Sequence, residues 1–495
     1  MTMSDDGVIS FPEIGGPDGP VTEDVLRVFG SMGQRDELPL LEQQRFVVHM
    51  LSAEVGKQVD GVMSVADICR HVVERVSATG GRILRADGYD EDCIQVGLHD
   101  GSLRYLTQGD LLKLMDRTKA GISVTGGGDS AGIADCLAAL AENLDGGRML
   151  LGVKNAASGL VVPCANFDDG LIIVDNLLIE DLRGQASTPF GSARMHAMNG
   201  DRDNTLRNID KFGFLSGTGG NGQLGLFIEV SKEFPDRVVV STPKTIDGDV
   251  CINGEPVQAL GFDTALKDYQ RSIFNIAQSV FSHREVTVVE VFGRSSGRLA
   301  FEAARHDPRN FCELKGNPDE KDLVRKIEEF GVTVMILVPE KPTSLKDIAD
   351  EVAKRKRKFG SCVVVVAEGF VPTGLVDDVN GGGMIKNVGK LVMEAIKDFA
   401  GIEKVKRASQ SYEARGATPS HYDQIMGAKC GKAMAGLING GVAGGKVVVY
   451  PEGVDPLTQE PLVMDLKEVS DKNTLRNAKL YSDDVLRKGG VFWKN

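Results

Sequence analysis

The nine residues from Ser241 to Asp249, STPKTIDGD, combine a cation, a hydroxyl and two carboxylates. They directly follow RVVV, a short apolar run that has the pattern of a buried strand. Asp247 and Asp249 alternate, so one carboxylate could accept a proton while the other helps to hold a metal ion. A solvated loop without a ligand rarely carries such mixed polarity straight after a buried strand. We therefore predict a catalytic site here.

Two glycine-rich stretches have the composition of anion-binding loops. The first, Thr125 to Gly132, is TGGGDSAG, and the second, Gly217 to Gln223, is GTGGNGQ. Glycines let backbone N–H groups approach an anion, and the helix expected after each loop adds a partial positive charge at its N-terminus. Two such loops at neighbouring strand ends could hold successive phosphates. The alternative for either loop alone is a tight turn without a ligand.

Two further strand ends carry single charged residues. Phe292-Gly293-Arg294 follows one apolar run, and Glu368-Gly369 follows another. An arginine at the mouth of a cleft suits phosphate recognition or neutralisation of transition-state charge. Either residue alone is ambiguous, because charged surface residues are common.

Other nucleotide-binding motifs fit poorly. Gly126 to Ala131 matches a loose G-x-G-x-x-A, but a dinucleotide site needs an acidic residue about 20 positions on, at the end of the next strand. The next expected strand ends at Lys154 and Asn155, which disfavours a dehydrogenase. No G-x-x-x-x-G-K-[ST] loop occurs in the sequence.

From Lys119 onward, β-branched runs of five to eight residues alternate with segments of helical pattern. The runs lie in GISVTGG, MLLGVKNA, FGFLSGTGG, RVVVSTPKT, EVTVVEVFG, VTVMILVPE, CVVVVAEGF and KVVVY. Continuous apolar strands that alternate with helices indicate parallel sheets covered on both faces. The strands are too many for one small sheet. We therefore predict an α/β fold with two doubly wound, mainly parallel-sheet lobes and a cleft between them, in which ligands bind beyond the carboxyl ends of the strands.

The first 118 residues follow a different pattern. Residues 1–20 are rich in Gly, Pro and Asp and predict a mobile tail, and residues 22–78 have helical spacing. After Gly80, RILRADG, CIQVGLHDG and SLRYLTQGDLLKLMD predict short strands followed by a helix. We expect a mostly helical N-terminal extension that has short strands.

Composition excludes several classes of protein. The 495 residues predict two to four domains, and 57 basic against 70 acidic residues give a net charge of −13, opposite to a general binder of nucleic acid or anionic membranes. No run of about 18 apolar residues occurs, and the acidic N-terminus lacks a signal-peptide pattern. The eight cysteines are scattered without metal-ligand spacing, which predicts reduced, mostly buried thiols in a cytoplasmic protein.

Taken in order, these motifs resemble those of the phosphofructokinase family, which phosphorylates the 1-hydroxyl of fructose 6-phosphate. The resemblance runs from about Lys119 to about Val449, and PKTIDGD is its most specific part. The other matching segments are GGGDSAG, GSAR (Gly191 to Arg194), TGGNGQ, GFDTA (Gly261 to Ala265), SHREVTVVEVFGR, VVVVAEGF and YEARG (Tyr412 to Gly416).

The resemblance implies a role for each motif. Asp247 would accept the proton of the sugar hydroxyl, and Thr245 would position that region. Magnesium would be the cofactor, near Asp249 and Asn221. Donor-binding residues would be Gly127, Gly128, Arg194, Gly220, Asn221, Gly222 and Lys244. Sugar-phosphate contacts would come from Thr245, Asp247, Asp249, Phe292, Gly293, Arg294, Glu368, Lys406 or Arg407, Tyr412 and Arg415, with Arg294 also catalytic.

The same resemblance implies a division of the chain. Residues 1–118 would be the extension, 119–280 a donor-binding lobe and 281–449 a sugar-phosphate-binding lobe, with a possible crossing of the chain between lobes. Residues 450–495 would pack back on the lobes. Family members build substrate sites across subunit boundaries, so we expect a homo-oligomer, a dimer or tetramer.

Three positions depart from the family pattern. Asn221 replaces an aspartate and should weaken magnesium binding. Phe292 replaces a methionine and would form a bulkier wall beside the sugar. Glu285 occupies the place of an arginine, which appears one position earlier as Arg284. These changes leave two alternatives open: a non-catalytic or regulatory subunit, or a kinase for another sugar phosphate.

The phosphoryl donor is ATP or pyrophosphate in this family. Gly222 leaves room for an α-phosphate and favours ATP, whereas Lys244 can pair with a phosphate and points towards pyrophosphate. Some ATP users resemble this combination of lysine and glycine. The sequence Ile-Asp-Gly-Asp resembles the corresponding segment of certain long pyrophosphate-dependent members. We expect ATP by a small margin, and no nucleic-acid or membrane partner.

Overall fold

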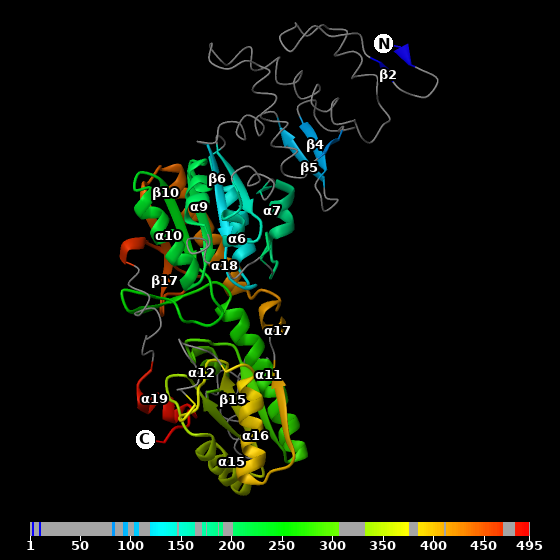
Figure 1. The fold of residues 1–495 in the computed structure, drawn as a ribbon, viewed down its shortest axis with the longest axis vertical. Helices are drawn as coiled ribbons and strands as arrows, with labels where there is room; N and C mark the ends of the chain where they lie inside the picture. The colour runs from blue at the N-terminus through cyan, green and yellow to red at the C-terminus, as the bar shows by residue number, and fades with distance from the viewer. Residues whose placement is uncertain are drawn as a thin grey trace.

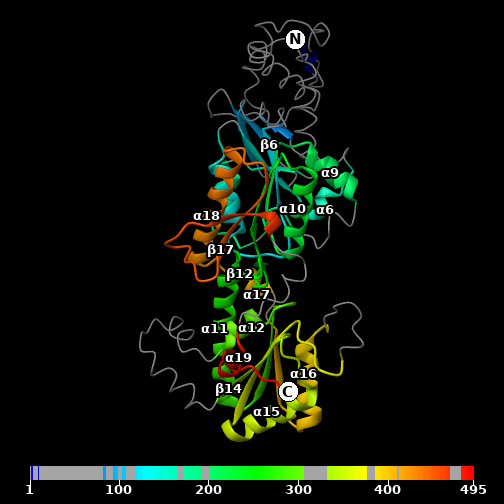
Figure 2. The same cartoon turned by 90° about the vertical axis from the view of Figure 1, so that its left-hand side faces the viewer.

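The computed structural model describes residues 2–3, 9–10, 82–84, 93–97, 103–107, 119–145, 148–163, 171–174, 176–186, 188–191, 201–305, 332–375, 385–409, 412–468 and 481–494. These residues form two α/β lobes, one above the other, joined by the long helix α11 (Phe262–His283) (Figures 1 and 2). We call the lobe that holds β6 the first lobe and the lobe that holds β13 the second lobe. The predicted α/β class with two mainly parallel-sheet lobes is confirmed.

A nine-stranded sheet forms the first lobe. Its order is β11-β12-β17-β10-β9-β6-β7-β8, with β18 paired to β17. The central strands are parallel and wholly or largely buried, as continuous apolar runs require. The strands are β6 (Ala120–Thr125), β7 (Met149–Val153), β8 (Leu171–Ile173), β9 (Phe214–Gly219), β10 (Val238–Pro243), β11 (Cys251–Ile252), β12 (Glu255–Gln258), β17 (Gly444–Pro451) and β18 (Leu462–Asp465).

Helices cover both faces of this sheet. One face packs against α5 (Ile133–Glu142), α7 (Asn176–Leu182) and α18 (His421–Asn439) through Leu137, Met434 and other apolar side chains. The opposite face packs against α10 (Asn221–Glu233), α6 (Ala157–Leu160), α9 (Arg202–Asp210) and the 3-10 helix η4 (Leu466–Glu468). The apolar face of each helix therefore fixes where its N-terminal loop emerges.

The second lobe is a four-stranded parallel sheet in the order β14-β15-β13-β16. Its strands are β13 (Val286–Val291), β14 (Val332–Leu337), β15 (Ser361–Ala367) and β16 (Val405–Ser409). One face packs against α11, α12 (Arg298–Ala304) and α19 (Asp483–Lys488), and the other against α15 (Leu345–Phe359) and α16 (Val388–Ala400). Ser344 caps α15 by accepting a hydrogen bond from Asp347 N, and α15 ends at Gly360 in the left-handed region.

The chain crosses between the lobes more than once. After β16 and the short helix α17 (Tyr412–Arg415), α18 packs on α5 and β17 pairs with β10 in the first lobe. The final described segment returns to the second lobe, where Leu486, Val491 and Trp493 join its core. The predicted division of the chain at residues 280 and 449 stays a prediction. The chain passes from the second lobe to the first after β16 and returns to the second lobe in its last described segment.

Parts of the N-terminal prediction can be compared with the structure. Strands β3 (Arg82–Leu84), β4 (Cys93–Gly97) and β5 (Leu103–Thr107) form a three-stranded antiparallel sheet, which confirms the short strands. A two-stranded pair, β1 (Thr2–Met3) and β2 (Ile9–Ser10), lies within the expected tail. The helical segment 22–78 and the helix expected before Lys119 lie outside the described residues.

Two further predictions from the sequence can be compared with the described residues. The described cysteines with assigned side chains, Cys136, Cys251, Cys362 and Cys430, are free and buried, as expected. None of the helices within the described ranges has the length and apolar character needed to cross a membrane.

Candidate active site

Three strand ends of the first lobe lie side by side. β9 pairs in parallel with both β6 and β10, so Thr125 lies opposite Thr218 and Pro243 lies opposite Gly219. The loops that begin at Gly126, Gly220 and Lys244 therefore leave one edge of the sheet together. Two backbone bonds hold them: Gly126 N donates to Thr218 O at 2.8 Å, and Lys244 N donates to Gly219 O at 2.9 Å.

Lys244 reaches from the third of these loops to the first. Its ammonium donates a hydrogen bond to Gly128 O at 2.7 Å, and only 3% of the residue is exposed. A Cβ atom at Gly127 would lie 2.7 Å from the same ammonium, so glycine is needed there. Burial lowers the pKa of Lys244 from 10.5 to about 7; Arg415 acts in the same direction, and Asp129 and Asp247 oppose it. Lys244 is thus a cation that loses its proton near neutral pH.

The carboxylate loop is ordered by short-range hydrogen bonds. Thr245 Oγ1 accepts from Asp247 N at 3.1 Å and donates to Asp249 Oδ1 at 3.2 Å. Asn221 Nδ2 donates to Asp249 Oδ2 at 3.2 Å. Both carboxylate oxygens of Asp249 are therefore bonded, and the Thr245 hydroxyl also holds the backbone of Asp247. This arrangement supports the positioning role predicted for Thr245.

The oxygen donors around Asp249 fit a magnesium ion. Asn221 Oδ1 is buried and makes no hydrogen bond with the described residues. The amide nitrogen of the same Asn221 donates to the Asp249 carboxylate, so the two side chains lie together. Mg²⁺ in phosphoryl-transfer sites takes one or two carboxylates, water and substrate phosphates rather than a full protein cage. Among the described residues no group of three or more His, Cys, Asp or Glu side chains could hold a metal ion. Magnesium binding therefore remains a prediction, in which the substrate phosphates and water would supply the remaining ligands.

The second lobe brings two strand ends to the same region. β13 and β15 pair in parallel so that Val291 lies opposite Ala367, which places Phe292 beside Glu368. Burial raises the pKa of the Glu368 carboxyl to about 7, the charge of Asp247 adds to the rise, and Arg415 opposes it. The charge of Asp247, which follows a strand of the first lobe, thus acts on Glu368 in the second lobe.

Arg415 connects the lobes. Its guanidinium stacks 4.3 Å from the centre of the Phe292 ring, and Nη1 donates to Asp129 O at 3.3 Å. A Cβ atom at Gly128 would lie 2.5 Å from Nη1. Arg415 and Lys244 thus place two cations against the first glycine loop, a suitable surface for an anionic ligand.

Some predicted residues are not gathered with this group. Arg294 is exposed, and its side chain makes no hydrogen bond or ion pair with another described residue. Lys406 pairs with Glu285 at 2.7 Å and lies beside Thr287 near the amino end of β13, about 16 Å along the strand from Phe292. Arg194 and the side chain of Tyr412 lie outside what the structure describes. Their predicted roles stay predictions.

Two supporting residues were missed by sequence reasoning. Gln223 lies between the first two glycine loops: a Cβ at Gly126 would be 2.3 Å from its Oε1, and one at Gly219 would be 2.1 Å from its Cβ. Tyr269, fully buried on α11, accepts a hydrogen bond from Phe292 N at 3.3 Å. Gln223 stands in the quoted motif TGGNGQ, which is a usable signal. A single tyrosine on an amphipathic helix gives none.

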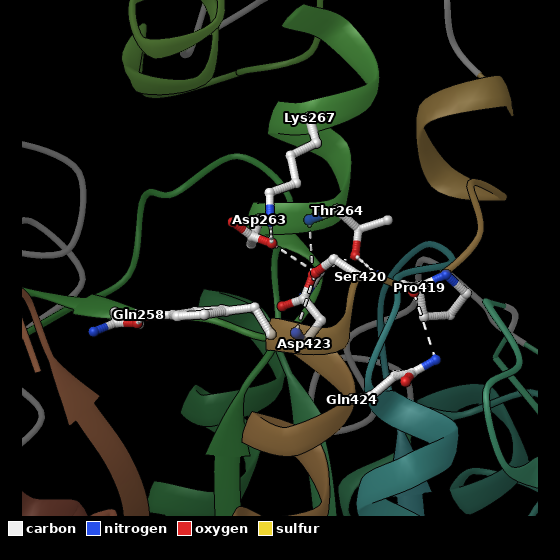
Figure 3. A network of polar contacts seen from close by, with 10 residues as sticks. Gln258, Asp263, Thr264, Lys267, Pro419, Ser420, Asp423 and Gln424 are labelled. Atoms are coloured by element: carbon white, nitrogen blue, oxygen red, sulfur yellow. Dashed lines mark hydrogen bonds and ion pairs between the residues drawn. The ribbon is translucent and has the colours of Figure 1, made fainter. Parts of the chain in front are cut away.

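A buried carboxylate anchors the start of α11 (Figure 3). Asp423 on α18 accepts hydrogen bonds from Gly261 N at 3.0 Å, Thr264 N at 2.8 Å and Thr264 Oγ1 at 2.5 Å. Ser420, which caps α18, also donates to Asp263 at 2.6 Å. These bonds satisfy the free N–H groups of the α11 N-terminus. They fix the helix that carries the second lobe against the first.

The sequence of this chain is similar to those of several known proteins. The family model described as Phosphofructokinase matches residues 120–438. A pyrophosphate–fructose 6-phosphate 1-phosphotransferase of Dictyoglomus thermophilum is 29% identical over 357 residues, 69% of this chain and 92% of the relative. An ATP-dependent 6-phosphofructokinase of Chloroflexus aurantiacus is 27% identical over 344 residues, 67% of this chain and 87% of the relative.

Solved structures show the same fold. A pyrophosphate-dependent phosphofructokinase from Nitrosospira multiformis superposes with a TM-score of 0.56 at 21% identity, covering 72% of this chain and 85% of that one. The phosphofructokinase of Saccharomyces cerevisiae superposes with a TM-score of 0.53 at 19% identity, covering 71% of this chain and 45% of that one. At these identities the likeness concerns the fold.

Proposed function

Since the chain belongs to the phosphofructokinase family, whose model matches residues 120–438, we propose that it transfers the terminal phosphoryl group of ATP to the 1-hydroxyl of fructose 6-phosphate. The observation that carries this proposal is that both Lys244 and, from α17, Arg415 bond to the first glycine loop. The charges of Asp247 and Arg415 also act on Glu368 at a strand end of the second lobe. These groups supply two cations for phosphates beside a carboxylate that can take a proton.

The arrangement suggests how each group acts. Asp247 accepts the proton of the sugar hydroxyl as its oxygen attacks the terminal phosphorus. Lys244 and the amides of the glycine loops stabilise the charge on the transferring group, and Arg415 holds a phosphate on the other side. Phosphoryl transfer needs mainly positioning and charge stabilisation, so this set of groups is sufficient.

Magnesium is the cofactor in this proposal. Asn221 Oδ1 and the Asp249 carboxylate would hold it, together with the donor phosphates. When bound, it would supply positive charge that neutralises the donor phosphates. Asn221 brings no negative charge, so we expect weaker magnesium binding than with an aspartate at that position.

The donor is the finer part of the proposal. Relatives of both kinds occur, pyrophosphate-dependent and ATP-dependent, at similar identity. Gly222 stands exposed at the start of α10 with no side chain to occupy the space beyond the terminal phosphates. Lys244 is bound to Gly128 O within the first loop. A lysine in that position serves the terminal phosphates of either donor, which leaves Gly222 as the reason to favour ATP.

A donor assay tests the proposal directly. Purified protein with fructose 6-phosphate and magnesium should turn over with ATP, and Gly222→Asp should lower kcat/KM for ATP by about 10-fold or more, about 1.4 kcal/mol, with a smaller effect on pyrophosphate. Gly225→Asp adds the same charge on the same helix, where a Cβ meets nothing within 4 Å, and should change neither. Folded protein inactive with both donors would refute the proposal and leave a non-catalytic subunit or another sugar-phosphate kinase.

The pH dependence of donor use follows from two groups. Lys244 has a lowered pKa of about 7, so its positive charge is present below pH 7 and lost above it. Glu368 has a raised pKa of about 7, so its negative charge appears as pH rises through the same range. Both changes make the site more negative. We expect kcat/KM for the donor to fall above about pH 7, as measured in pH profiles of the free enzyme.

Arg415→Met provides the matching test. Because the Arg415 charge helps to lower the Lys244 pKa, its removal should move this fall to higher pH. A profile that stays flat from pH 6 to 9 in the unmodified protein would contradict the assignment.

Subunit association is also part of the proposal. Lys406 and Glu285 lie on the second lobe away from the site of their own chain, with the Lys406 side chain 60% exposed. The resemblance implies substrate sites that cross subunit boundaries, and we propose that in a homo-oligomer Lys406 contacts the sugar phosphate of a neighbouring subunit. Sedimentation measurements of the purified protein would test it.

A further inference from the structure

The loop that carries Asp247 and Asp249 is held by hydrogen bonds and by packing. Thr245 and Asn221 donate hydrogen bonds to Asp249, as described above. At Gly248, the residue before Asp249, the backbone of the loop packs against two side chains. Gly248 has φ of 65°, and a Cβ atom there would lie 2.7 Å from the Phe262 ring and 2.8 Å from Arg298 Cδ. The stem of Arg298 and the Phe262 ring therefore form a wall directly behind the residue between Asp247 and Asp249.

Arg298 is itself fixed from both lobes. It begins α12 in the second lobe, is 7% exposed, and its guanidinium lies 4.6 Å above the Phe262 ring at the start of α11. Its Nη2 donates to both oxygens of Glu452, at 2.8 and 2.7 Å. Glu452 directly follows β17 in the first lobe. The ion pair thus joins the lobes behind the catalytic loop.

A cavity of about 320 Å³ adjoins this wall. Gly248, Phe262, Arg298, Asp423 and Glu452 all line it. The loop therefore has open space behind it. If the wall moved, Gly248 could retreat into the cavity and take both catalytic carboxylates with it.

We propose that Arg298, held by Glu452, is a positioning residue for the reaction: it keeps the Asp247–Asp249 loop forward against the substrates. The proposal rests on the function proposed above. Because the pair acts on the loop and touches neither phosphate site, its loss should lower kcat and leave the binding of the sugar phosphate almost unchanged.

The experiment compares Glu452→Gln, Arg298→Met and the double variant with the unmodified protein. Each single variant should lower kcat by about 10-fold, with KM for fructose 6-phosphate within about 2-fold, because small displacements of a catalytic group have large effects on rate. The double variant should lose no more than the worse single one, because both break the same contact. Arg298→Lys keeps the charge and should recover much of the rate.

A matched control exists in the first lobe. Arg237 pairs with Asp210 at 2.8 Å and lies 4.6 Å from the Phe234 ring, the same combination of ion pair and ring, at the amino end of β10. Asp210→Asn should leave kcat unchanged. Hydrogen exchange of residues 245–250 gives a readout independent of activity, and it should accelerate in Glu452→Gln and Arg298→Met but not in the control.

The outcomes separate the two proposals. An unmodified protein without turnover would remove the proposed function, and loop exchange would still decide whether the pair holds the loop. An active protein in which Glu452→Gln and Arg298→Met retain full kcat and normal loop exchange would overturn the positioning role. Equal losses in the Asp210→Asn control would also overturn it, since they would reflect general destabilisation.

Discussion

Replacing Asp247 by serine should reduce kcat by about 10² to 10⁴-fold, the range that a positioned general base contributes. The substitution should keep the hydrogen bond from the backbone N–H of residue 247 to Thr245 Oγ1, because this bond does not involve the side chain. The KM for fructose 6-phosphate should change little, since its phosphate would be held by cations elsewhere. Steady-state kinetics with saturating donor measure the effect.

The control residue lies at the opposite end of β10, the strand that leads into the Asp247 loop. Asp236 is exposed before β10, on the edge of the sheet away from the site, and Asp236→Ser removes the same charge there. It should retain full activity. If Asp247→Ser kept a rate within a few-fold of the unmodified protein, the base would have to be another group, and the proposed mechanism would be wrong.

Lys244→Met should lower kcat/KM for the donor by about 10² to 10³-fold, as removal of one group that stabilises transition-state charge does in other enzymes. Methionine keeps the length of the chain but cannot donate to Gly128 O or balance a phosphate. Its thermal stability should be unchanged or higher, because an apolar side chain replaces a buried cation whose pKa burial has lowered to about 7.

Loss of activity together with retained stability would distinguish a functional lysine from a structural one. Lys446→Met on β17 of the same sheet removes a partly buried lysine that pairs with Asp465, and it should leave donor use intact. A Lys244→Met protein that unfolds at much lower temperature, with normal specific activity of the folded fraction, would contradict the role.

Much of the fold was predictable from local pattern. All eight β-branched runs became strands, because a short, mostly apolar run of this kind suits a sheet that is buried on both faces. The strands that sequence reasoning missed are short or polar: β16, VKRAS, lies at the edge of its sheet with Lys406 and Arg407 exposed. An edge strand buries few side chains, so its sequence carries a weak signal.

Most of the residues that the structure brings together at the strand ends also stand in motifs that are visible in the sequence. Glycine loops, PKTIDGD and the charged strand ends are local motifs, and parallel pairing brings the ends of neighbouring strands together. The order of strands, β10-β9-β6, and the crossing of the chain back to β17 were not readable, because they depend on contacts between segments that are separated in the sequence, such as Gly121 with Phe214 and Val238 with Gly444.

What the sequence determined by itself is therefore the chemistry: which side chains stand at strand ends, and that the strands are parallel and buried. The tertiary structure decided which of them meet. It joined Lys244 and Arg415 to the first glycine loop, left Arg294 exposed and turned Lys406 toward Glu285. It also placed Arg298 behind Gly248. The reason is physical: backbone pattern follows from neighbouring residues, whereas the pKa of Lys244 and the support of Asp247 follow from burial and charge supplied by distant parts of the chain.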